Sequence, residues 1–224
     1  VALSAFATKF LVEFPDSNDL RLAWARLLTE WGELESALEQ FNELARREPG
    51  NSDAIYASGV LSLEIGDIQN AARWLGRYLE LDPDHDQSRL YLAQIAVQEE
   101  RYDDALAWLR AVTESELYFD AQLRIGAALA AAGRVEEAVD HLVGIVPDSV
   151  AEQVRIYLAH EQILRGTRGL DAALSLLDAA LAEAMAGLAR PEQRKSAPAV
   201  RPGRLCLLNR VSIEYSECCF QNLR

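Results

Sequence analysis

The chain has 224 residues, of which 50% are hydrophobic and 25% charged, and its formal net charge is −13. This composition is too apolar for a disordered acidic tail, and the length suits one solenoid or one to two compact domains. The excess of negative charge argues against nucleic acid as a ligand and favours basic or apolar partners.

A period of 34 residues organises the sequence from its N-terminus. Pro15, Pro49 and Pro83 are 34 residues apart, and so are Gly32 and Gly66. Proline lacks an N–H group and disfavours helical geometry in the residue before it, so each proline ends a helix. The predicted helices are, in chain order, 18–31 and 34–47, 52–64 and 68–81, 86–99 and 102–114, 116–132 and 135–146, and 149–165 and 170–186.

Small and bulky residues recur at fixed places in this period. A small residue on each helix lets the paired helices approach closely, and a bulky residue fills the space beside it. The small positions are Ala25, Gly59, Ala93 and Gly126 on the first helices and Ala37, Ala71, Ala105 and Ala138 on the second, followed by Phe41, Leu75, Leu109 and Leu142 as the bulky positions. In the fifth pair, Ala159 is the expected small residue of the first helix.

These positions resemble the tetratricopeptide repeat, and the resemblance covers about residues 1–187. It implies an all-α, right-handed helical solenoid of about five helix-turn-helix repeats. The expected units are a half repeat at 1–14 and repeats at about 18–49, 52–83, 86–115, 116–147 and 149–187. A solenoid that starts on half a repeat suggests a piece of a longer array, and the chain begins at Val1 without an initiator Met.

Residues 188–224 continue none of these positions. They carry seven Lys or Arg against three Asp or Glu, which gives +4 and leaves −17 on residues 1–187. All three cysteines, Cys206, Cys218 and Cys219, lie there. Two interpretations stay open, namely an irregular basic linker or added sequence foreign to the natural protein, or a terminal element that caps the solenoid around 205–213.

Motifs for catalysis or metal binding fail on inspection. Asp82, Asp84 and Asp86 alternate as in a calcium loop, but Gln87 stands where that loop needs glycine. His160 lacks the second histidine of a zinc-protease helix, because Leu164 occupies its place. No phosphate-binding, dinucleotide-binding or nucleophile-turn motif is present in the sequence. We therefore expect no enzymatic activity, no metal and no cofactor.

Tetratricopeptide arrays bind partners mainly in a concave groove lined by first helices, and the resemblance implies the same here. The residues expected in the groove are Leu22, Arg26, Tyr56, Val60, Leu63, Leu90, Gln94, Leu123, Ile156 and His160, with acidic edges at Asp19, Asp53, Glu64 and Asp120. Such a surface suits an apolar helix or extended segment that carries Lys or Arg. We expect a protein or peptide partner, no nucleic acid and no membrane insertion.

Three segments, LRLAWARLLTEWGELESALEQF, YLAQIAVQEERYDDALAWLRAV and AQLRIGAALAAAGRVEEAVDHL, resemble more narrowly the tetratricopeptide lipoproteins of the proteobacterial cell envelope. Those proteins are adaptors for partners such as a carboxyl-terminal processing protease. This resemblance implies a bacterial protein, in the cytoplasm or on the periplasmic side of the envelope if a signal or lipid anchor was removed. The alternative function is a regulatory or substrate-delivery segment of a longer enzyme-associated polypeptide.

Overall fold

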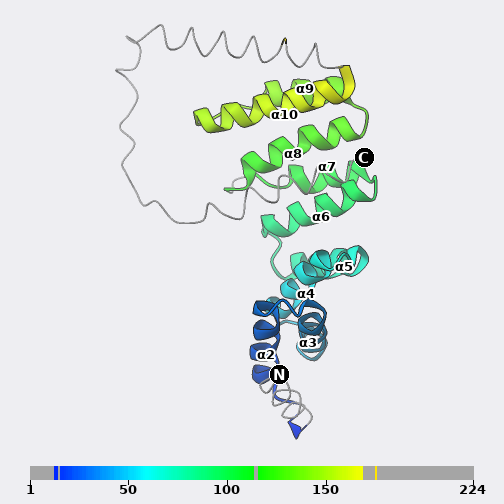
Figure 1. Ribbon diagram of the computed structural model, residues 1–224, viewed down its shortest axis with the longest axis vertical. Coiled ribbons are helices and arrows are strands. Elements are labelled where there is room, and N and C mark those ends of the chain that lie inside the picture. The colour runs from blue at the N-terminus through cyan, green and yellow to red at the C-terminus, as the bar shows by residue number, and fades with distance from the viewer. Residues whose placement is uncertain (1–12, 15, 114–115, 169–174, 176–224) are drawn as a thin grey trace, which may run out of the picture. The chain divides into compact units, whose positions relative to one another are not determined.

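The computed structural model describes residues 13–14, 16–113, 116–168 and 175, and the elements it forms there are all α-helices. Figure 1 shows them following one another along the long axis of the picture. Their bounds are α2 Asn18–Glu30, α3 Leu34–Arg47, α4 Ser52–Glu64, α5 Ile68–Leu81, α6 Asp86–Gln98, α7 Tyr102–Arg110, α8 Tyr118–Ala131, α9 Val135–Val143 and α10 Val150–Arg168.

The helices form pairs that stack in sequence order. Each of the four complete pairs, α2 with α3, α4 with α5, α6 with α7 and α8 with α9, packs within itself and against its neighbour in the chain. A further helix, α10, packs on both α8 and α9. This arrangement confirms the all-α tetratricopeptide-type solenoid that the period predicted.

The turn inside each pair has the same conformation in all four repeats. Gly32, Gly66 and Gly133 have φ angles of 76°, 80° and 78°, and the fourth turn has Glu100 at a φ of 59°. The residue after each of these donates its N–H to a carbonyl five residues earlier, as from Glu33 to Leu28 at 2.9 Å. This Schellman-type bond ends the first helix and starts the second at a defined angle.

The small residues predicted from the period lie at helix crossings. Ala71 and Ala105 have no exposed surface, which confirms their expected burial. At Gly59 and Gly126 the space for a side chain is already occupied, because Leu75 and Leu142 of the paired helices lie against them. Small and bulky positions therefore interlock within each repeat, as close packing requires.

Helix ends differ from the expected ones mainly on second helices. The helices α7 and α9 stop at Arg110 and Val143, a few residues before the predicted ends, whereas α10 continues to Arg168. Among the described residues, no helix is long and apolar enough to cross a membrane. Nearly all of the predicted helix at 170–186, nearly all of the half repeat at 1–14, and the whole tail at 188–224 lie outside the described residues.

Candidate functional site

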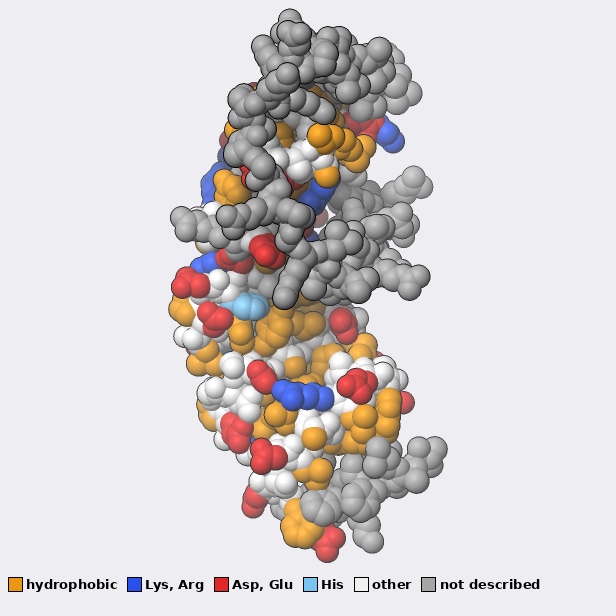
Figure 2. All heavy atoms as spheres, turned by 90° about the vertical axis from the view of Figure 1, so that its left-hand side faces the viewer, with side chains coloured by type: hydrophobic (Ala, Val, Ile, Leu, Met, Phe, Trp, Pro, Cys, Tyr) orange, Lys and Arg blue, Asp and Glu red, His pale blue; other side chains and the backbone are white. Residues whose placement is uncertain are grey.

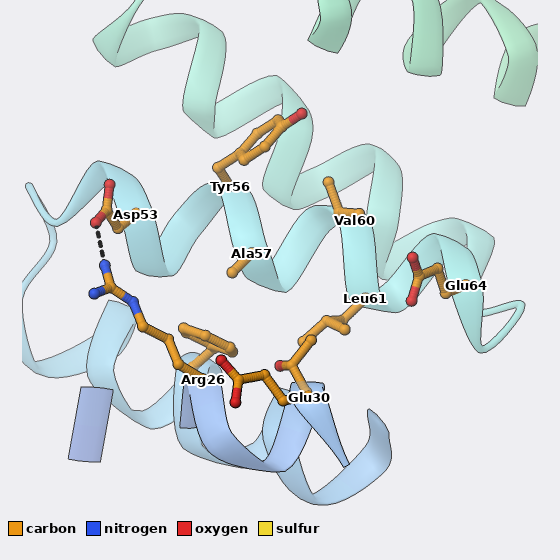
Figure 3. A pocket seen from close by; sticks show the side chains of 10 residues that line it. Arg26, Glu30, Asp53, Tyr56, Ala57, Val60, Leu61 and Glu64 are labelled. Atoms are coloured by element: carbon orange, nitrogen blue, oxygen red, sulfur yellow. Dashed lines mark hydrogen bonds and ion pairs between the residues drawn. The ribbon is translucent and has the colours of Figure 1, made fainter. Parts of the chain in front are cut away.

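A hollow of about 510 Å³ opens between the first helices of the first two repeats (Figure 3). Its lining comes from α2 and α4, with one residue of α3 between them. The lining residues are Arg26, Thr29, Glu30, Phe41, Asp53, Tyr56, Ala57, Val60, Leu61 and Glu64. Because α2 and α4 occupy equivalent places in successive repeats, the hollow lies between first helices, which is where the sequence placed the expected groove.

The floor of the hollow is apolar and its edges are charged. Phe41 and Leu61 are almost fully buried, with 4% exposure each, and form a fixed base. Ala57 and Val60 lie above them on α4 and are half-buried. Figure 2 shows hydrophobic side chains gathered on one face of the molecule, between the grey regions, with acidic side chains around them.

Tyr56 is held in place by two other rings. The centroids of Tyr78 and His85 lie 5.0 Å from that of Tyr56 and 4.8 Å from each other. Desolvation by burial, helped by Tyr91 and Tyr78, raises the pKa of Tyr56 to about 12. The phenol is therefore neutral at physiological pH, and its ring is a preorganised apolar contact with one polar end.

His85 fixes this cluster at the junction with the third repeat. Its Nδ1 accepts the backbone N–H of Ser88 at 3.2 Å and lies 2.8 Å from the Ser88 hydroxyl oxygen. His85 thereby caps α6 in the place where Asn51 caps α4, 34 residues earlier.

An ion pair crosses one side of the hollow. Arg26 on α2 donates to Asp53 on α4 at 2.8 Å, and Figure 3 shows this bridge between the two helices. Both side chains are more than half exposed, so the pair adds little to stability. Within the lining, the negative charge of Asp53 is balanced by the positive charge of Arg26.

A second ion pair joins first helices at the other end of the array. Arg155 on α10 pairs with Asp120 on α8, and its guanidinium lies 5.0 Å from the centroid of the Phe119 ring. Asp120 occupies the position in α8 that Asp53 occupies in α4, six residues before the small residue. Charges that couple neighbouring first helices are thus a recurring feature of this surface.

The expected groove residues divide into three groups, of which two are at least partly exposed. Arg26, Tyr56 and Val60 line the hollow. Leu22, Leu63, Gln94 and Leu123 are half-buried on first helices outside its lining. Glu30 also lines the hollow and was not predicted from the sequence, although Glu64 was, and Glu64 stands 34 residues later in the same position of the repeat.

Three expected groove residues are buried, and their assignment to the groove is wrong. Leu90 is 2% exposed and belongs to the core cluster that extends from α6 to α10. Ile156 and His160 are 5% and 8% exposed, although both were expected to face a ligand. None of these side chains is part of an accessible surface.

A shift in register explains the error on α10. The buried residues of α8 recur 35 residues later on α10, so Ile156 and His160 correspond to the buried Ala121 and Ile125. Gly126 then corresponds to Glu161, whereas the expected small residue was Ala159. The connection after Val143 is long enough to displace the repeat by two residues.

The displaced register gives α10 different surface residues. Leu158, which is 56% exposed, takes the position of Tyr56 and Leu123, and Gln162 takes the position expected of His160. Across the part of the chain that the structure describes, no group of three or more His, Cys, Asp or Glu side chains is arranged to hold a metal ion.

Comparison with known families identifies the repeat directly. Two family models described as tetratricopeptide repeat match the chain, one over residues 22–86 and 90–148 and the other over residues 62–117. A comparison with curated proteins finds no match.

Solved structures share the fold. A MamA RS-1 double mutant is 19% identical and has a TM-score of 0.62, with 78% of this chain and 98% of that chain covered. MamA 41-end from Desulfovibrio magneticus RS-1 is 19% identical, with a TM-score of 0.61 and coverage of 76% and 97%. YrrB, described as a protein of this repeat class with an unusual peptide-binding site, is 22% identical, with a TM-score of 0.58 and coverage of 77% and 89%.

Proposed function

Because the chain belongs to the tetratricopeptide repeat family, we propose that the hollow between α2 and α4 binds an apolar segment of a partner protein that carries basic residues. Family membership makes the chain a protein–protein interaction scaffold. The position of the binding site and the chemistry of the ligand are the parts that we propose here. The observation that carries them is the apolar, acid-edged lining of the hollow.

The dimensions and the lining of the hollow support a peptide-like ligand. A volume of about 510 Å³ lies within the range of sites that bind small molecules or a few side chains of a peptide. The base of Phe41 and Leu61 offers apolar contact, and the Tyr56 ring adds an aromatic anchor of the kind that dominates binding energies at interfaces. The related fold of YrrB, whose description names a peptide-binding site, agrees with this choice.

The lining offers groups that are suited to binding a peptide. Its titratable groups are one arginine, three carboxylates and one tyrosine, whose raised pKa makes it a poor proton donor or acceptor near neutral pH. We propose that the protein works by holding its partner and carries out no reaction on it.

The test uses a random library of linear peptides displayed on phage and selected on the full chain. The affinity of the best selected peptide is then measured by fluorescence anisotropy against two variants. Val60→Asp places a charge in the apolar lining of the hollow, which a bound apolar segment would desolvate, and we expect it to weaken binding by about tenfold or more, equivalent to about 1.4 kcal/mol.

The matched control is Gln69→Asp, which puts the same side chain at an exposed position of α5 outside the hollow. We expect the affinity of this variant to stay within a factor of about two, because surface charges mostly change association rates. Equal affinities for both variants, with both folded, would place the binding surface elsewhere on the array.

A further inference from the structure

Glutamate ends both helices that form the hollow. Glu30 is the last residue of α2 and Glu64 is the last residue of α4, and neither helix has a basic residue in its last turn. The C-terminus of a helix carries a partial negative charge, so a carboxylate there is unfavourable and a cation is favourable. By contrast, α3 ends with Arg46 and Arg47, as the helix dipole favours.

The charges of Glu30 and Glu64 are also left without a partner. Among the residues that the structure describes, neither carboxylate takes part in an ion pair or a hydrogen bond. The one cation of the lining, Arg26, is bound to Asp53. The lining therefore carries two uncompensated negative charges beside an apolar floor.

This pattern is confined to the first two repeats. Glu30 and Glu64 occupy the same position of the repeat, five residues after the small residue, where the third and fourth repeats have Gln98 and Ala131. The carboxylates of Glu30 and Glu64 thus lie in the lining of the hollow at the C-termini of α2 and α4, whose helix dipoles add partial negative charge there.

Resting on the proposed function of the hollow, we infer that Glu30 and Glu64 select a ligand with a Lys or Arg side chain beside its apolar residues. The cationic group binds at the ends of α2 and α4, where both helix dipoles and both free carboxylates favour positive charge. The Arg26–Asp53 pair is already neutral and attracts neither sign. A bound segment consequently has a fixed direction, with its basic residue toward Glu30 and Glu64.

The experiment measures a double-mutant cycle on the peptide selected from the phage library. The protein changes are Glu30→Gln and Glu64→Gln together, and the peptide change is replacement of its Lys or Arg by norleucine, which keeps the apolar stem. We expect the protein change to weaken binding of the basic peptide about three- to tenfold and to leave the norleucine peptide within about twofold. The control is Glu80→Gln, an exposed glutamate of α5 outside the hollow, which should not discriminate between the peptides.

The melting temperature of the variants distinguishes a loss of binding from a loss of folding. Removing two carboxylates from helix C-termini should leave the melting temperature equal or slightly higher, so weaker binding does not come from unfolding. Selected peptides that lack a basic residue, or a cycle with no coupling, would overturn the inferred selectivity while Val60→Asp still reports on the hollow. Peptides whose binding is insensitive to Val60→Asp would instead overturn the proposed site itself.

Discussion

A Cβ atom added to Gly59 on α4 would lie 2.8 Å from Cγ of Leu75 on α5, closer than a real Cβ approaches a neighbouring carbon atom. We expect Gly59→Ala to lower the free energy of unfolding by about 1–3 kcal/mol, because the crossing is overpacked. This loss is partly offset by the higher helix propensity of alanine. Urea denaturation followed by circular dichroism measures the change.

The control for this prediction is Gly76→Ala on the same pair of helices. Gly76 lies inside α5, and a Cβ atom there meets nothing within 4 Å. The substitution should raise the free energy of unfolding by about 0.4–1 kcal/mol, because alanine restricts the unfolded chain. If both variants were stabilised equally, the close approach of α4 and α5 at Gly59 would have to be abandoned.

Glu100 occupies a turn position that holds glycine in the other three complete repeats. Its φ of 59° is in the left-handed region, which costs a residue with a side chain about 1–2 kcal/mol. Glu100→Gly should therefore stabilise the protein by up to about 1 kcal/mol and raise the melting temperature. The reverse change, Gly66→Ala, places a side chain at a φ of 80° and should be destabilising. A lower melting temperature for Glu100→Gly would contradict the conformation of this turn.

The raised pKa of Tyr56 predicts a dependence of stability on alkaline pH. Burial raises this pKa from 10.0 to about 12, so between these values the folded state binds more protons than the unfolded state. The contribution is fully present below pH 10, and the free energy of unfolding falls as the pH rises toward 12. Tyr56→Phe should show a shallower decrease over this range in urea titrations. Identical slopes for the two proteins would show that Tyr56 ionises as an exposed phenol.

Two substitutions two residues apart test the register of α10. Ile156→Asp buries a charge at a position that is 5% exposed, and it should lower the free energy of unfolding by more than about 2 kcal/mol. Leu158→Asp alters a side chain that is 56% exposed and should change it by less than about 0.5 kcal/mol. The opposite order in thermal melts would restore the register in which Ala159 is the small residue.

The sequence alone determined the architecture of the repeats. The spacing of small residues such as Ala71 and Ala105 predicts helix crossings, and the spacing of Gly32 and Gly66 indicates turns. They do so because each position satisfies a local steric requirement that few residue types meet. The same spacing also predicted Arg26, Tyr56 and Val60 as groove residues, and these three side chains line the hollow between α2 and α4.

Only the tertiary structure decided which positions are accessible and which charges are compensated. The register of α10 depends on the path of the connection after α9. A repeat period alone does not predict how many residues such a loop contains. The burial of Leu90 depends on a core cluster to which several helices contribute, from α6 to α10. The pairing of Arg26 with Asp53, and the absence of a partner for Glu30 among the described residues, follow from distances between helices. A repeat fixes the type of contact at each position, whereas the packing of neighbouring repeats decides whether a side chain is available to a ligand.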